Sequence, residues 1–275
     1  MNMKEFRIGL YFAAFFLASC IGFTSCLKSD KTSFTDVPIV QACFEPGSRI
    51  SVTVSRKTPY DDSQKLSELD INSLKVMVSY AGTWYTLMTA GNGRYTDTTG
   101  VIPVIADSSY SLSFEYNGKL ITSSTKVPVK PYGVSQSVTS VSMAQIDPDN
   151  TTFTKPPDPV EISFTNDDES YYMLTVECIE DWKVPVYKDS IPSNDIMSTP
   201  PATRNSIYIH PMNIRYFGHN RILLYHITSE YASCFRQQES TTQNYQQPPT
   251  NIENGLGIFT GINADTLYLN VIQTK

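Results

Sequence analysis

A two-residue turn, Asn117-Gly118, lies between two alternating segments and constrains the fold of this chain more than any other feature. Leu112, Phe114 and Tyr116 alternate with polar residues before the turn, and Leu120 follows it. Asn-Gly is the pair that best accepts the two positive φ angles of a tight hairpin turn. Alternation with a period of two buries one face of a strand and exposes the other. The segment therefore predicts an antiparallel β-hairpin with one buried face.

The same alternation recurs along the first half of the chain. Ile50, Val52 and Val54 alternate with Ser and Thr residues. About seven strand-length segments, separated by turn signals, lie between residues 37 and 128. The 17 Tyr, 13 Phe and 17 Pro residues favour strands with turn-rich connections over helices. We expect a mainly β protein in which residues 37–128 form an antiparallel β-sandwich.

A proline-rich segment at residues 127–131 marks the expected domain boundary, because proline cannot donate to a strand ladder. Residues 129–275 form the second expected domain, which is also β-sandwich-like but less regular. Residues 162–164 and 172–179 predict a hairpin with a longer turn between them. The last two segments are 255–259 and 266–272, and the second of them predicts a strand.

A short helix is expected near residues 229–239, with Ser229 as its N-cap. Tyr231 and Phe235 would share one face of this helix, because residues four apart are neighbours on a helix surface.

The N-terminus has the pattern of an export signal. Lys4 and Arg7 precede an apolar run from Ile8 to Leu17, and small residues then lead to Cys20 and Cys26. A positive start, a short apolar stretch and a small-residue cleavage site are typical of a secretory signal peptide. The run is shorter than the ~20 apolar residues that span a bilayer. We expect residues 1–25 to be a lipoprotein signal peptide.

A cysteine directly after the cleavage point is the bacterial lipobox pattern, in which that cysteine carries the lipid. Leu17-Ala18-Ser19-Cys20 matches the usual letters, but cleavage before Cys26 leaves a polar start suited to a tether over residues 26–36. We favour Cys26 as the lipidated residue, with Cys20 as the alternative. A plain secretory signal with incidental cysteines is the third interpretation. Several acyl chains together would hold the mature chain on a membrane.

The charge of the chain and its cysteines argue against two classes of protein, those that bind nucleic acid and those built on a disulfide framework. The net charge is −6 and no Lys/Arg cluster is present, which argues against nucleic-acid binding. Beyond the signal, Cys43, Cys178 and Cys234 are too few and too far apart for a disulfide framework. Cys178 alternates with Leu174 and Val176, so we expect it to be a buried free thiol.

The sequence contains no motif that predicts a catalytic site, a metal site or a cofactor. His210, His219 and His226 share no metal-ligand spacing, and we expect each to be a surface or packing residue. No Gly-x-Ser-x-Gly elbow occurs. The glycines of segment 255–261 do not fit a dinucleotide-binding loop, because the third comes one residue late and too few residues follow for a βαβ unit. We expect these glycines to permit a close backbone approach or a bulge beside a strand.

Two acidic turns could bind calcium, although this interpretation is the weaker one. Asp147, Asp149 and Asn150, or residues 166–169, carry oxygen ligands of the kind that calcium prefers. Turns are rich in these residues for conformational reasons, so the turn interpretation is favoured. A pair of carboxylates that meet only in the folded chain also stays open.

Two ends of the chain carry a family resemblance. The opening Val37-Pro38-Ile39-Val40-Gln41-Ala42-Cys43-Phe44-Glu45-Pro46-Gly47 and the closing Asn251-Ile252-Glu253-Asn254-Gly255-Leu256-Gly257-Ile258-Phe259 are its main motifs. They resemble Bacteroidetes surface lipoproteins that carry a domain of unknown function and are often encoded beside TonB-dependent outer-membrane receptors. The resemblance implies an N-terminal immunoglobulin- or transthyretin-like sandwich, a second β-rich domain and an outer-membrane location, facing the periplasm or the cell surface. It implies no catalytic residues.

The leading functional hypothesis is a non-enzymatic ligand-binding or accessory lipoprotein of a TonB-dependent uptake system. Recognition on sandwiches usually lies in loops, which directs attention to the irregular excursion at 181–205 and to a candidate binding loop at Asn251, Ile252 and Glu253. The ligand itself is not identified by the sequence. The alternatives are a structural or adhesive surface protein that pairs edge strands, and a hydrolase with two facing carboxylates.

Overall fold

The computed structural model describes residues 35–58, 69–147, 149, 155–188, 194–236 and 248–274. The predicted signal peptide, most of the tether, and both Cys20 and Cys26 lie outside these residues. Within the described part, no helix has the length and apolar character needed to cross a membrane.

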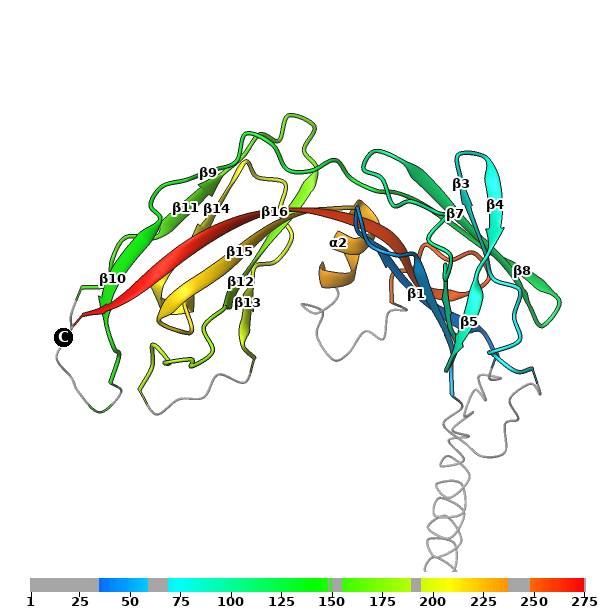
Figure 1. Cartoon of the computed structure of the whole chain (residues 1–275), viewed down its shortest axis with the longest axis horizontal. Coiled ribbons are helices and arrows are strands. Elements are labelled where there is room, and N and C mark those ends of the chain that lie inside the picture. Colours follow the sequence, from blue (N-terminus) through cyan, green and yellow to red (C-terminus); the bar gives the residue numbers. More distant parts are fainter. Residues whose placement is uncertain are drawn as a thin grey trace, which may run out of the picture. The chain divides into compact units, whose positions relative to one another are not determined.

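The described chain is mainly β, as predicted, with its strands in a nine-stranded, a four-stranded and a three-stranded sheet (Figure 1). The elements of the first half are β1 (Pro38–Phe44), β2 (Ser51–Arg56), β3 (Met77–Tyr80), β4 (Thr83–Thr86), β5 (Met88–Gly91), β6 (Arg94–Thr96), β7 (Ser109–Tyr116) and β8 (Lys119–Lys126). Those of the second half are β9 (Ser135–Gln136), β10 (Ser140–Ala144), β11 (Val160–Ser163), β12 (Tyr171–Cys178), β13 (Ile196–Ser198), β14 (Ser206–Ile209), η1 (Pro211–Asn213), β15 (Gly218–Ile227), α2 (Ser229–Arg236) and β16 (Leu256–Thr274).

The predicted hairpin is confirmed. β7 and β8 pair antiparallel up to Tyr116 opposite Lys119, so that Asn117-Gly118 is a two-residue turn. Asn117 has φ 49° and Gly118 has φ 73°, the positive values that this turn requires. Leu112 and Phe114 are buried, as the alternation predicts.

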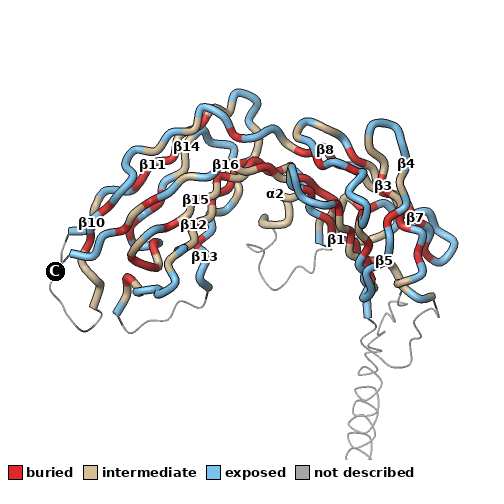
Figure 2. Tube along the Cα trace, in the orientation of Figure 1, coloured by how far each residue is buried: buried red, intermediate tan, exposed pale blue. Residues whose placement is uncertain are grey.

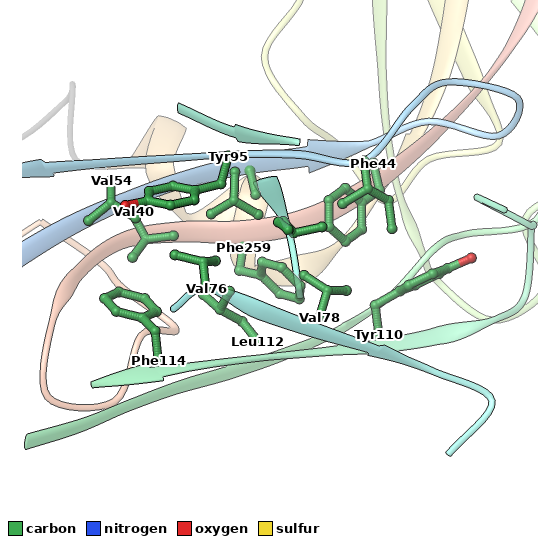
Figure 3. Packing of buried hydrophobic residues seen from close by; sticks show 14 of the residues in the cluster. Val40, Phe44, Val54, Val76, Val78, Tyr95, Tyr110, Leu112, Phe114 and Phe259 are labelled. Carbon is green, nitrogen blue, oxygen red and sulfur yellow. The ribbon is translucent and has the colours of Figure 1, made fainter. Parts of the chain in front are cut away.

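The first core lies between the four-stranded sheet β4-β3-β7-β8 and the strands β1, β2, β6 and β16 of the nine-stranded sheet. Figure 3 shows side chains of the two layers directed toward one another, with Phe44 and Phe259 opposite Tyr110 and Leu112. The ring centroid of Phe44 lies 4.9 Å from that of Phe259 and 5.3 Å from that of Tyr110, both in edge-to-face contact. This core is a β-sandwich, as expected, but it is not wholly antiparallel or confined to residues 37–128, because β16 pairs parallel with β1 in one of its layers.

A second β-sandwich-like core lies between the three-stranded sheet β14-β11-β9 and the strands β13, β12, β15, β16 and β10. Cys178 is buried beside this core as a free thiol, as predicted. Along both sandwiches the buried positions follow the strands, and most of the exposed positions lie in the connections (Figure 2).

One strand serves both cores. The strand predicted over residues 266–272 is longer than expected: β16 begins at Leu256, with Phe259 in the first core and Leu269 in the second. β16 pairs parallel with β1 over residues 256–261 and antiparallel with β15 over residues 262–271. The first core therefore takes Ile252 and Phe259 from beyond the predicted boundary at residue 128.

The glycine pattern in β16 has the structural role that the sequence predicts. Gly257 has φ +100°, and a Cβ at this position would lie 1.9 Å from the carbonyl oxygen of Val40 on β1. Only a residue without a side chain permits this approach of the two strands.

The prediction that residues 162–179 form a hairpin is wrong, because the two strands do not pair with each other. β11 pairs with β14 and β9, whereas β12 pairs with β15 and β13. The two strands face each other across the second core, where the rings of Phe164 and Tyr172 lie 4.4 Å apart. Both strands have one buried face, and this alternation does not determine whether they pair or oppose each other.

The helix α2 is present, but its cap differs from the prediction. The Tyr231 amide donates to the hydroxyl of Thr228, at 3.2 Å, so Thr228 rather than Ser229 is the N-cap. Tyr231 and Phe235 contact each other edge to face and pack beside Ala232 and Ile227, as the helical spacing predicts. α2 is described to Arg236, and the remainder of the predicted helix to residue 239 lies outside the described residues.

Candidate functional site

In the predicted binding loop, the side chains of Asn251, Ile252 and Glu253 all make contacts within the protein. The Asn251 side-chain amide donates to the Phe259 carbonyl at 2.7 Å and accepts from the Phe259 amide at 3.0 Å. Ile252 is buried in the first core. The Glu253 amide donates to the Thr122 carbonyl, and the Thr122 hydroxyl donates to the Glu253 carboxylate.

The segment therefore fastens β8 and β16 together. That this segment binds a ligand stays a prediction. Two other places in the structure form pockets.

The first pocket lies between part of the predicted excursion and residues 212–215, and has a volume of about 430 Å³. We call it the excursion pocket. Its lining combines the edge strand β13 with the short helix η1 and the segments around them: Pro185, Tyr187, Asn194, Ile196, Met197, Ser198, Met212, Asn213, Ile214 and Arg215.

An ion pair beside this pocket joins the two limbs of the excursion. The Lys183 ammonium lies 2.7 Å from one oxygen of Asp195, and the Tyr216 hydroxyl donates to the other at 2.5 Å. The hydrogen bond from Lys183 lowers the pKa of the Asp195 carboxyl, and donation to Asp195 raises the pKa of Tyr216. Asp195 is therefore a carboxylate at neutral pH, and the three side chains form one polar cluster.

Exposed apolar side chains flank this polar cluster. Trp182 is 90% exposed, and Val184 on the other side of Lys183 is also exposed. We define the excursion surface as these two residues together with three other exposed side chains, Ile179, Ile196 and Met212. The sequence located the excursion by its prolines and irregularity, but it carried no signal for which of its apolar residues remain in water.

The second pocket, about 370 Å³, lies where segments of the two halves of the chain meet. We call it the junction pocket. Its lining comes from the ends of β8, β12 and β15 and from the turns beside them: Asp107, Lys126, Val127, Pro128, Val129, Asp168, Glu169, Ser170, Tyr171, His226, Ile227, Thr228 and Ser229. Lys126 and Asp107 form an exposed ion pair at 2.6 Å.

His226 is the buried polar residue of the junction pocket, with 8% of its surface exposed. Its ring stacks on Tyr172 with centroids 4.7 Å apart, and its Nδ1 lies 2.9 Å from the Val129 carbonyl oxygen. Burial lowers the pKa of this imidazole, although the bond to Val129 opposes the shift. His226 is thus neutral at pH 7. As expected, its ring packs against another residue, Tyr172, but His226 also lines the junction pocket.

The possible calcium turns have other roles where they are described. Asp147 pairs with Lys188 at 2.8 Å, and the Asn166 amide donates to the carbonyls of Ser170 and Thr203. Among the residues that the structure describes, no three His, Cys, Asp or Glu side chains gather as metal ligands would. Asn150 lies outside the described residues.

The sequence profile of one family, the domain of unknown function DUF4249, matches residues 27–267. The chain belongs to the DUF4249 family. The matched residues include the linings of both pockets, so each pocket is part of the DUF4249 domain. The opening and closing motifs that carried the resemblance also lie within this match.

Further comparisons add little to the DUF4249 assignment. None of the curated proteins compared with the chain matches it. Among solved structures, the FN1–FN3 domains of chicken CNTN1 match with 12% identity and a TM-score of 0.26. The match covers 70% of this chain and 59% of that one. At this TM-score the likeness carries no argument about fold or function.

Proposed function

We propose that this chain is a non-enzymatic, lipid-anchored outer-membrane protein that serves as a ligand-binding or accessory component of a TonB-dependent uptake system. The N-terminal pattern supports the anchor, with Cys26 as the lipidated residue and Cys20 as the alternative. A polar tether over residues 26–36 would then hold the folded part at the membrane, on its periplasmic or cell-surface side. The family resemblance supports a TonB-dependent receptor as the partner.

The excursion surface is the observation that carries the accessory role. Its five apolar side chains stay exposed, and three of them, Trp182, Val184 and Ile196, are sequence neighbours of the charged Lys183–Asp195 pair. Apolar anchors within a polar rim are the usual composition of a protein–protein interface, and Trp is enriched among the residues that dominate binding energy. Covering such surface is favourable by about 25 cal/mol per Å² of apolar area. We infer that a partner protein covers the excursion surface.

The test is a pull-down from native outer membranes with tagged full-length chain in which Cys26 is intact. Recovery of a TonB-dependent receptor in stoichiometric amounts is the expected result. Trp182→Ala should reduce that recovery at least tenfold, because loss of a central interface Trp costs about 2 kcal/mol or more. Trp84→Ala is the matched control, since Trp84 is the other tryptophan of the chain, is exposed, and lies on β4 in the first sandwich.

Two results would overturn the proposal. Recovery of the chain alone as a monomer would remove the accessory role. Recovery of the chain only as its own oligomers would favour the structural alternative, in which edge strands such as the fully exposed β5 pair between copies. Equal recovery by the two tryptophan variants would place the receptor contact away from the excursion surface.

A further inference from the structure

The junction pocket carries a second inference, independent of the receptor contact because it shares no lining residue with the excursion pocket. Its charged groups are three carboxylates, from Asp107, Asp168 and Glu169, and one ammonium, from Lys126. The Lys126 ammonium is paired with Asp107. The pocket therefore has two carboxylates in excess.

His226 adds an acceptor atom to this acidic lining. A carbonyl oxygen only accepts hydrogen bonds, so the contact between Nδ1 and Val129 requires that Nδ1 carries the proton. In the neutral ring Nε2 is then a lone-pair acceptor. Within the described part of the chain, no group is hydrogen-bonded to this Nε2, and the residue lines the pocket. A nine-tenths buried side chain thus contributes an acceptor without a protein partner to a pocket whose lining carries excess negative charge.

The turn between β11 and β12 holds the Asp168 carboxylate by hydrogen bonds. The Ser170 amide donates to Asp168 at 3.3 Å, and the hydrogen bond from the Ser170 side chain lowers the pKa of the Asp168 carboxyl. Glu169, directly after Asp168, has φ 55°, a left-handed backbone conformation. Asp168 is close enough to His226 for each to influence the other electrostatically.

We propose that the junction pocket binds a small organic cation, through an ammonium or guanidinium group that donates to the Nε2 atom of His226 and is attracted by the carboxylates of Asp168 and Glu169. Such groups offer several N–H donors and a positive charge, and charge-assisted hydrogen bonds to carboxylates are the stronger kind. The apolar remainder of the ligand would lie against Val127, Pro128 and Ile227. A volume of about 370 Å³ suits a small molecule rather than a folded partner.

The first test follows the imidazole resonances of the full-length chain by NMR while n-butylammonium or methylguanidinium is added at millimolar concentrations. We expect a saturable shift of the His226 resonance, with His210 and His219 unchanged. Assignment uses the His226→Gln variant. n-Butanol and butyrate are matched neutral and anionic probes and should leave His226 unshifted. Absence of a saturable shift with both cations, or a shift with butyrate, would overturn the proposal.

Asp168→Asn should weaken n-butylammonium binding about tenfold, because it removes one charged acceptor. Asp167→Asn is the matched control, since Asp167 is exposed in the same turn but does not line the pocket. The thermal unfolding midpoints of both variants establish that each is folded. Equal affinities for the two folded variants would contradict the assignment of Asp168.

The pH dependence has a defined sign. The titratable and charged groups around His226 are the Tyr172 ring that stacks on it and, in the lining of the same pocket, Asp168, Glu169, Tyr171 and the Asp107–Lys126 pair. Burial lowers the pKa of His226 from 6.5, so the ring becomes charged only in more acidic solution. An imidazolium repels a cation and offers no lone pair. Affinity for n-butylammonium should therefore fall as the pH decreases through that pKa, and a rise in affinity would identify an anion site instead.

Discussion

At the scale of single residues, Gly257 makes the sharpest prediction. Alanine there would place its Cβ 1.9 Å from the Val40 carbonyl oxygen, in a backbone conformation with φ +100°. The positive φ costs about 1–2 kcal/mol for an L-residue, and the overlap must be relieved by moving β1 away from β16. We expect Gly257→Ala to lower the free energy of unfolding by about 3 kcal/mol or more, as measured by urea denaturation.

Gly118→Ala is the control for the conformational part of that loss. Gly118 also has positive φ, at +73°, but no atom lies within 4 Å of the position that a Cβ would take. This variant should lose only about 1–2 kcal/mol. If both variants lost the same free energy, the close approach of β1 and β16 would not be a significant constraint.

At the scale of elements, Asn251 joins the loop before β16 to the strand itself. Its side-chain amide is bonded to both the amide and the carbonyl of Phe259. Asn251→Ala leaves these backbone groups without their partner, which costs about 1–3 kcal/mol. We expect faster hydrogen exchange at the Phe259 amide and a lower unfolding midpoint. Glu253→Gln should change neither, because Gln still accepts from the exposed Thr122 hydroxyl.

The elements also show which parts of the fold the sequence determines locally. The β7–β8 hairpin was predictable because Asn117-Gly118 and the alternation around it specify both turn and register. The pairing of β11 and β12 was not, because two strands that bury one face in the same core satisfy the alternation whether they pair or oppose each other. The course of β16 likewise depends on partners far away in the sequence, β1 and β15.

At the scale of the whole molecule, the two candidate sites differ in how far the local sequence predicts them. Prolines and irregular patterning marked the excursion at 181–205, which supplies six of the ten lining residues of one of the two pockets. The junction pocket combines residues 107, 126–129, 168–171 and 226–229, which no local pattern connects. The sequence around His226 did not predict a binding role for it. That role depends on the Val129 carbonyl, the Tyr172 ring and the Asp168 carboxylate, which lie near His226 only in the folded chain.

The sharing of β16 predicts that the two cores unfold together. Loss of either core would release a part of β16 and with it residues of the other, Phe259 on one side and Leu269 on the other. We expect circular dichroism in urea to show a single transition for the full-length chain. Leu112→Ala in the first core and Leu174→Ala in the second should each shift that whole transition, by about 2–5 kcal/mol. Independent cores would instead give two steps, of which each variant moves only one.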